Sequence, residues 1–259
     1  MGSNGKDVAA GVAQALGASL ILYEIIDHLA DRMRVRKSHV VRLLEDGQDL
    51  DQALTPEDIL PAILSPLEVL ELASIPEPVV LRGWGATALL RSVDHVLRVR
   101  VTAPYETRIA NLRKRVPNPD DEKIKQEIAY SDEAHGAIMR RHFNVDYRDP
   151  ALYHLVLNTG EMPVTECVER IVAASLDPRY AETEASRHRL VSLSTETHLK
   201  ALLKLHPPTR DVAIGIVADG TKVILSGTVA STEIKERCEM VACRVPGVTD
   251  VHTELLVAG

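Results

Sequence analysis

The sequence lacks any uninterrupted apolar stretch of about 18 residues, the length that a membrane-spanning helix needs. Its first residues lack the basic start, apolar core and small-residue cleavage site of an export signal. Cysteine is scarce: Cys167, Cys238 and Cys243 are odd in number and have no CxxC spacing, which argues against a disulfide framework or a zinc cluster. These absences predict a soluble, cytoplasmic protein with no transmembrane segment, in which the cysteines are packing residues.

Signals for metal and nucleic-acid binding are also missing. The histidines have no HExxH or similar spacing, so no metal site is expected. A nucleic-acid-binding surface would need a broad basic stripe and a raised pI, whereas this chain has a pI of about 5.8 and a formal net charge of -7. The charge is uneven, however: residues 43–78 contain acidic side chains and no basic one, while six basic residues and one acid lie between Arg98 and Arg115. That basic run is a candidate phosphate-binding region.

A length of 259 residues predicts two domains, and the first extends over residues 1–176. Strands are predicted at 79–81, 96–101 and 155–157, and helices at 7–17, 21–34, 86–91 and 122–142. This alternation indicates an α/β domain with a mostly parallel sheet. The acidic segment 43–78, interrupted by prolines, is predicted to form short helices in a lid or insertion.

The second domain is predicted over residues 188–259, after a polar linker at 177–187. Its expected elements are helix 188–205, strands 212–217 and 223–229 joined by a hairpin turn, helix 231–243 with Ser231 as N-cap, and strand 251–257. The order α-β-β-α-β predicts a small open-faced α+β sandwich.

Two motifs at the expected separation characterise this second domain. Val223–Val229 matches the strand pattern V-x-L-x-G-x-V, and Val245–Val248 with Val251 matches the turn pattern V-x-G-V-x-x-V. The segment therefore resembles the BON domain. The resemblance implies a regulatory or binding module without chemistry of its own, whose partner is a small molecule, a lipid surface or a protein. Gly227 is expected to let a helix approach the sheet, and Gly247 to adopt a positive φ.

The first domain contains several short motifs in a characteristic order. Residues 2–9 (GSNGKDVA) correspond to a G-S-G-G-basic-acidic-I-A phosphate turn, Arg82-Gly83 to a G-R-G strand end, residues 103–108 to A-P-x-x-x-R, and residues 153–159 to Y-D-L-V-x-N-T. In this order they resemble the cytidylate-kinase-like family of nucleoside monophosphate kinases, from Gly2 to about Ala174. The resemblance implies phosphoryl transfer from ATP, with Mg²⁺, to a nucleoside monophosphate such as CMP or dCMP.

The resemblance also implies a set of site residues. A glycine turn that opens a helix presents unpaired amides and the positive end of the helix dipole to phosphate, and arginine can bind phosphate bidentately. By this resemblance, the residues expected to bind ATP are Gly2, Ser3, Asn4, Gly5, Lys6 and Asp7. The residues expected to be catalytic are Lys6, Arg108, Arg140 and Arg141. The residues expected to bind the substrate are Glu24, Arg82 and Asp132.

Three features leave a second hypothesis open: one departs from the Walker A motif and two depart from the family pattern. Asp7 stands where a Walker A motif has the Ser or Thr that binds magnesium, and His135 stands where a lid arginine is expected. The strand that would precede the phosphate turn is absent, which predicts a P-loop-kinase-like sheet lacking its first strand; Met1 is then hypothesised to be an internal methionine. The alternative function is a degenerate, non-catalytic kinase that acts as a sensor or scaffold through the BON domain.

Simpler roles also remain open for these residues. Residues 2–6 could form a flexible terminus, Arg82 could cap a strand, and Arg108, Arg140 and Arg141 could belong to a solvated helix face.

Overall fold

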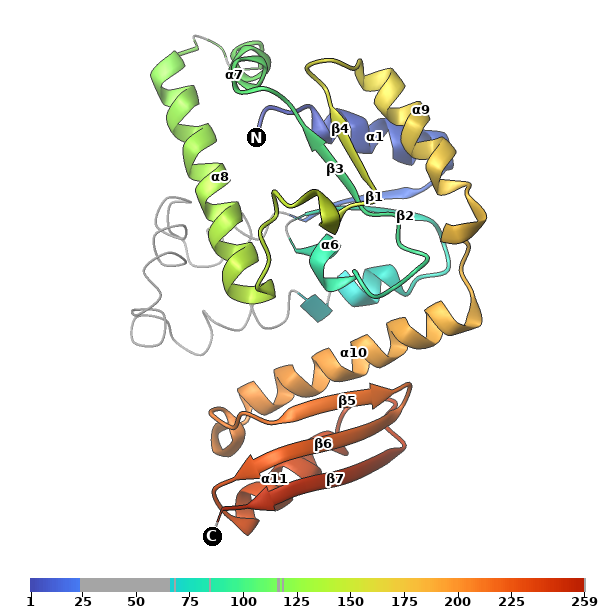
Figure 1. Cartoon of the computed structure of the whole chain (residues 1–259), viewed down its shortest axis with the longest axis vertical. Helices are drawn as coiled ribbons and strands as arrows, with labels where there is room; N and C mark the ends of the chain where they lie inside the picture. The colour runs from blue at the N-terminus through green and yellow to red at the C-terminus, as the bar shows by residue number, and fades with distance from the viewer. Residues whose placement is uncertain (24–65, 68, 84, 116, 118, 259) are drawn as a thin grey trace. The chain divides into compact units, whose positions relative to one another are not determined.

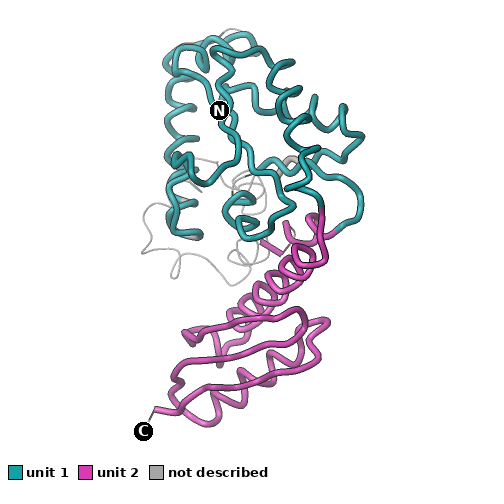
Figure 2. Tube along the Cα trace, turned by 45° about the vertical axis from the view of Figure 1, so that its right-hand side comes forward, with its two compact units in different colours: residues 1–58, 75–181 teal, residues 59–74, 182–259 magenta. Residues whose placement is uncertain are grey.

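The computed structural model describes residues 1–23, 66–67, 69–83, 85–115, 117 and 119–258. The chain divides into two compact units (Figure 2): unit 1 comprises residues 1–58 and 75–181, and unit 2 comprises residues 59–74 and 182–259. Glu24, the remainder of the helix predicted at 21–34 and most of the acidic segment lie outside the described residues. None of the described helices is long and apolar enough to cross a membrane.

Unit 1 is a mixed α/β structure with two small parallel sheets. Its elements are α1 (Gly5–Leu16), β1 (Ser19–Tyr23), β2 (Val79–Gly83), α6 (Ala86–Leu89), β3 (Val99–Thr102), α7 (Tyr105–Arg113), α8 (Asp121–Phe143), β4 (Leu155–Asn158) and α9 (Val164–Ser175), with 3-10 turns at Pro150–Leu152 and Pro178–Tyr180. β1 pairs with β2 from Ser19↔Val79 to Tyr23↔Gly83, and β3 pairs with β4 from Val99↔Leu155 to Thr102↔Asn158. Among the described strands of this unit, β2 and β3 are not hydrogen-bonded to each other.

One core joins both sheets of unit 1 to the helices α1 and α9, which lie side by side (Figure 1). The buried side chains come from α1, β4 and α9, and side chains of β2 and β3 pack against them. The buried members are Val8, Val12, Leu157, Cys167 and Ile171. α1 is therefore fixed against the sheets by its apolar side, and its first turn lies at one end of this core.

Two helix boundaries differ from the sequence-based predictions. Residues 21–23 belong to strand β1 rather than to a helix. The prediction was wrong because a short run of apolar residues is compatible with either a buried strand or a buried helix. The helix predicted from residue 188 begins at Glu184, where Thr183 and Ser186 form a capping box. The polar segment 177–187 thus contains the first residues of a helix as well as a linker.

Unit 2 has the predicted α-β-β-α-β order. It consists of α10 (Glu184–Leu205), a 3-10 turn at Pro207–Thr209, β5 (Gly215–Asp219), β6 (Lys222–Val229), α11 (Thr232–Ala242) and β7 (Asp250–Val257). β5 pairs antiparallel with β6, and β6 pairs parallel with β7. Ser231 caps α11 by accepting a hydrogen bond from Ile234 N, as predicted.

The two glycines singled out in unit 2 have different explanations. Gly247 has φ +83°, as expected. Gly227 has φ +125°, and a Cβ there would meet Ile214 only at ordinary contact distance (3.6 Å to Cα), so backbone conformation and not a closely approaching helix requires this glycine. Of the cysteines, Cys167 and Cys238 are buried, whereas Cys243 is exposed and is not a packing residue.

Candidate functional site

Residues 2–6, here called the N-terminal turn, have a conformation that few sequences can adopt. Gly2 has φ +80° and Asn4 has φ +54°, and α1 starts directly afterwards at Gly5. A Cβ on Gly2 would lie 2.7 Å from the carbonyl oxygen of Arg108, so both backbone angle and space require glycine. The first intrahelical hydrogen bond runs from Val8 N to Asn4 O. The backbone N–H groups before Val8 therefore have no hydrogen-bond acceptor among the carbonyl groups of the helix.

Side chains from later in the sequence hold the N-terminal turn in place. Arg108 Nε and Asn111 Nδ2, both on α7, donate to the carbonyl oxygens of Met1 (2.6 Å) and Gly2 (3.0 Å). Thr159, which follows β4, donates to Ser3 O at 3.0 Å. The turn is therefore an ordered part of unit 1, which a freely flexible terminus would not be.

Cationic side chains surround the start of α1. Arg82, at the end of β2, places its Nε 3.9 Å from where a Cβ of Gly5 would lie. Arg115 Nη2 donates to Asn4 Oδ1 at 3.0 Å and forms an ion pair with Asp7. Lys6 lies in the first turn of the same helix. Helix N-termini with open amides and nearby cations attract anions such as phosphate.

Arg115 was not among the residues singled out from the sequence. It lies at the end of the basic run between Arg98 and Arg115, which does indicate phosphate binding in general terms. The contact itself joins positions 108 residues apart, from Asp7 to Arg115, and only the fold brings them together.

The fold also brings Arg108 and Asp132 together, and their side chains form an ion pair with each other. Arg108 donates two hydrogen bonds to the Asp132 carboxylate, at 2.7 and 2.6 Å. Burial raises the pKa of Asp132, but the hydrogen bonds and charge of Arg108 outweigh this effect and hold the pKa below its usual value. Because Arg108 also bonds Met1 O, this pair connects α8 to the N-terminal turn.

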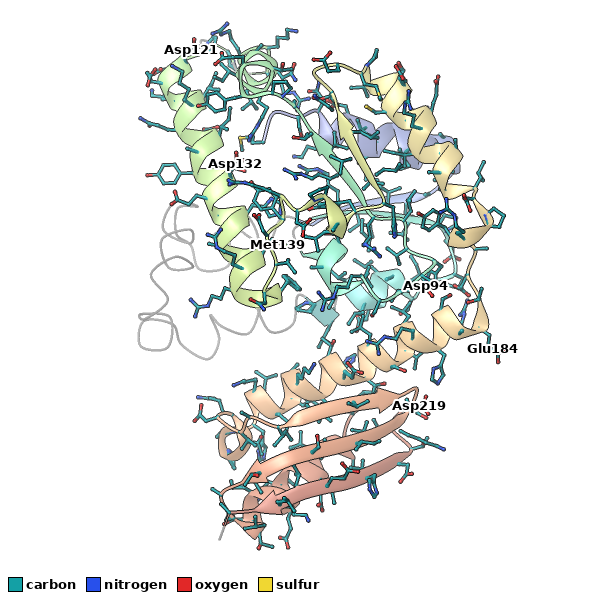
Figure 3. All side chains as sticks on the ribbon, viewed as in Figure 1. Asp94, Asp121, Asp132, Met139, Glu184 and Asp219 are labelled. Atoms are coloured by element: carbon teal, nitrogen blue, oxygen red, sulfur yellow. The ribbon has the colours of Figure 1, made fainter. Side chains whose placement is uncertain are left out.

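Arg140 and Arg141 lie elsewhere. Both are exposed on α8, eight and nine residues after Asp132, which is about 12 Å along the helix axis. Arg140 Nη1 lies 3.1 Å from where a Cβ of Gly136 would be, so it folds back over its own helix. Figure 3 marks the course of α8 by Asp121, Asp132 and Met139. The structure thus gathers Lys6, Arg82, Arg108 and Asp132 near the turn, and leaves this arginine pair apart.

A second polar cluster surrounds His135 on α8. Its ring stacks on Tyr147 with centroids 4.0 Å apart, and the guanidinium groups of Arg100 and Arg148 each lie 5.4 Å from the centre of the same tyrosine ring. Burial lowers the pKa of His135 to about 4; the N-terminal ammonium, Arg100 and Arg148 add to this effect, and the Asp132 carboxylate opposes it. His135 is therefore a neutral imidazole at physiological pH.

The donor atoms at the turn suit phosphate but not a protein-held magnesium ion. Magnesium prefers a near-octahedral set of oxygen ligands. The residue after Lys6 is Asp7, whose carboxylate is engaged by Arg115. Within the described ranges, no group of three or more His, Cys, Asp or Glu side chains could hold a metal ion.

Comparisons with known proteins agree with the two-part organisation. The model of the cytidylate kinase-like family matches residues 1–161, and the model of the BON domain matches residues 194–259. A search of curated proteins finds no match.

Among solved structures, the chain is similar to an uncharacterized protein from Eubacterium ventriosum, with 14% sequence identity and a TM-score of 0.50, over 68% of this chain and 93% of that one. At this identity the likeness concerns the fold alone. The first family model covers more than half of the sequence. The chain therefore belongs to the cytidylate kinase-like family and contains a BON domain in residues 194–259.

Proposed function

We propose that this chain binds the phosphates of a nucleoside phosphate at the N-terminal turn. The observation that carries the proposal is the convergence of the first amides of α1, which precede its first intrahelical hydrogen bond, with Lys6, Arg82 and Arg115. Backbone amides and cationic side chains together are the usual means of holding polyphosphate. The family match supports the nucleotide as the phosphate carrier.

The reaction that follows from the family is phosphoryl transfer from ATP to CMP or dCMP. A phosphate oxygen of the monophosphate attacks the γ-phosphorus of ATP, the bond from that phosphorus to the β,γ-bridging oxygen breaks, and ADP leaves. The protein's contribution to such a transfer is mainly positioning and charge neutralisation. Lys6 and Arg82 are proposed to bind phosphate groups, while Glu24 and Asp132 remain proposed acceptor-binding residues.

A second candidate is a nucleotide sensor that binds without turnover, and one feature favours it. Arg108 and Asp132 are held by each other, and Arg140 and Arg141 lie about two helical turns away from them. A kinase of this kind needs guanidinium groups at the transferring phosphoryl group. In such a sensor, nucleotide binding to the first domain would change the binding activity of the BON domain.

Binding and turnover separate these candidates. The full chain would be titrated with a fluorescent ADP analogue, and ADP release from ATP plus CMP would be followed in a coupled assay. We expect saturable binding that Lys6→Ala weakens by at least about tenfold, since a charged hydrogen bond to phosphate is lost. Lys125→Ala, which removes an exposed lysine paired with Glu122, is the control. Turnover identifies the kinase, binding without turnover identifies the sensor, and absence of binding refutes both.

We further propose that the BON domain regulates or localises the nucleotide-binding unit in the cytoplasm, where ATP is available. Its ligand is proposed to be a small molecule, a lipid surface or a protein. Cosedimentation of the full chain with neutral and with anionic vesicles tests the lipid alternative.

A further inference from the structure

We propose that helix α10 carries a docking surface for a helix of the acidic segment, and that this docking links the BON domain to the strand that carries Arg82. The surface lies on the side of α10 opposite the core of the BON domain. The link to Arg82 rests on the proposed function, because it concerns the regulation of the proposed nucleotide site.

α10 has buried side chains on two opposite sides. Leu199 and Leu203 belong to the core that α10 shares with the BON strands and α11. Leu190 and Ala201 are buried as well, with 4% and 5% exposure. Leu190 lies nine residues before Leu199, about two and a half helical turns, so these two leucines point in opposite directions. Ala201 lies about three turns after Leu190 and shares its side; these two residues are here called the second face of α10.

The acidic segment contributes a helix to the same compact unit. Residues 66–67 and 69–73 are helical and are here called the insertion helix. They belong to unit 2, together with α10 and the BON sheet, although they precede β2 of unit 1 in the sequence (Figure 2). Leu67 and Leu70, three positions apart on one side of this helix, are only 8% and 0% exposed. The insertion helix therefore buries an apolar stripe.

The second face of α10 and the apolar stripe of the insertion helix account for each other's burial. Unit 2 consists of residues 59–74 and 182–259, and the BON strands and α11 pack against the opposite side of α10. Of the chain assigned to this unit, residues 59–74 remain to cover the second face. Leucine side chains that interlock between two helices remove apolar surface from water on both.

A short, stiff connection joins the insertion helix to β2. Ser74 directly follows the helix, and its hydroxyl donates to Leu70 O at 2.7 Å. Two of the next four residues are Pro76 and Pro78, which fix φ and favour an extended backbone in the residue before each. Pro78 O accepts a hydrogen bond from Ser19 N at 3.0 Å, beside the start of β2. A shift of the insertion helix is therefore transmitted to β2.

β2 ends next to the proposed phosphate site. Arg82, near its end, places Nε 3.9 Å from where a Cβ of Gly5 would lie. Docking of the insertion helix on α10 holds β2, and with it Arg82, in this position. A ligand of the BON domain that changes α10 therefore changes nucleotide affinity, and nucleotide must change the affinity for that ligand by the same factor.

Hydrogen exchange of the full chain tests the docking. Leu70→Ala should accelerate exchange of the amides from Leu190 to Ala201 by at least about tenfold, because the cavity loosens the contact between the helices. Leu190→Ala should accelerate exchange in the insertion helix to a similar extent. Because the two side chains belong to one contact, the double variant should exchange less than about threefold faster than the faster single variant.

Ile75→Ala and Val191→Ala are the matched controls. Each lies next to the proposed contact in the sequence, but the two side chains are 38% and 41% exposed. Neither substitution should change these exchange rates by more than about twofold. Circular dichroism checks that each variant is folded. Should an alanine variant not fold, Leu70→Val and Leu190→Val replace it, with smaller accelerations in the same direction.

Nucleotide affinity tests the link to Arg82. In a titration of the full chain with the fluorescent ADP analogue, Leu190→Ala should weaken binding by at least about fivefold, although Leu190 is not a residue of the proposed site. Val191→Ala should bind the analogue as the wild type does.

Failure of this inference and failure of the proposed function look different. Accelerations that multiply in the double variant, or α10 amides that Leu70→Ala leaves unchanged, overturn the docking. A Leu190→Ala variant that binds the analogue as tightly as the wild type does overturns the link to Arg82. Absence of wild-type binding overturns the proposed function and the link with it, while the exchange rates still decide the docking.

Discussion

Gly2 is the residue of the N-terminal turn that tolerates substitution least. Alanine there would have to adopt φ +80° and would place its Cβ 2.7 Å from Arg108 O. We expect Gly2→Ala to lower the free energy of unfolding by roughly 1–3 kcal/mol, through backbone strain and displacement of the turn. It should also weaken nucleotide binding by at least about tenfold, because misplaced amides lose their phosphate contacts. Thermal unfolding and the fluorescence titration measure the two effects.

Gly17→Ala is the control for this substitution. Gly17 ends the same helix with φ +61°, but a Cβ there would meet nothing within 4 Å. It should therefore lower stability by only about 1 kcal/mol and leave nucleotide affinity unchanged. Equal losses of affinity in the two variants would mean that the turn has no special role.

His135 predicts a pH dependence of stability. Its pKa in the folded chain is about 4, below the ordinary histidine value of 6.5. The unfolded chain therefore binds the proton first, and stability is lost as the pH falls from about 6.5 towards 4, by roughly 1–3 kcal/mol. Urea unfolding at pH 7 and at pH 5 should show a loss that His135→Gln reduces and that the exposed control His252→Gln does not. Identical pH dependence in wild type and His135→Gln would contradict the assignment.

The sequence alone singles out the N-terminal turn, Arg82 and Asp7 as candidates, because each stands in a recognisable motif. It does not single out Arg115, whose contact with Asn4 joins positions that are far apart in the sequence. It also could not show that Arg108 is engaged by Asp132, since ion pairing depends on distances that motifs do not encode.

At the scale of elements, α10 supports the hairpin of unit 2 with polar side chains. Ser192 Oγ accepts from Gly220 N at 2.8 Å, and Thr195 Oγ1 donates to Gly220 O at 3.0 Å. Glu196 Oε1 accepts from Ala218 N at 3.3 Å. All three side chains are buried. The helix therefore provides hydrogen-bond partners for backbone groups of β5 and of the turn that follows it.

Ser192→Ala should lower the free energy of unfolding by about 1–2 kcal/mol, because it leaves the buried Gly220 N–H without its acceptor. Hydrogen exchange of that amide should accelerate at the same time. Thr197→Ala is the control, since its hydroxyl bonds to Leu193 O within α10 itself. If the Gly220 amide exchanges at the same rate in both variants, Ser192 is not its partner in solution.

Elements with two independent signals were predicted well. The α11 helix has both an N-cap at Ser231 and inward-facing Cys238 and Val241, and it was found where expected. β1 has no N-cap residue or hairpin turn to distinguish it, and the sequence predicts a helix from residue 21 instead. Pairing was harder still: the parallel registers of β1 with β2 and of β3 with β4 join residues about 60 apart, which no local pattern specifies.

At the scale of the whole molecule, nucleotide binding should stabilise the fold by mass action. ADP at a hundred times its dissociation constant should raise the free energy of unfolding of the binding unit by about 2.7 kcal/mol. Hydrogen exchange should slow in α1, α7 and the segment after β4, because these elements hold the turn. At the same ADP concentration, Gly2→Ala should lower this stabilisation to about 1.4 kcal/mol or less, because a tenfold weaker affinity leaves ADP at no more than about ten times its dissociation constant. Undiminished stabilisation in Gly2→Ala would place the nucleotide elsewhere.

The most direct measurement of the central claim is the response of individual backbone amides to nucleotide. In an NMR titration of the full chain with ADP, the account predicts that the amide signals of Ser3, Asn4, Gly5 and Lys6 shift first and most, together with the Nε–H signal of Arg115. Phosphate bound at the start of α1 would have to touch these groups. Saturation of binding with those signals unmoved would contradict the account.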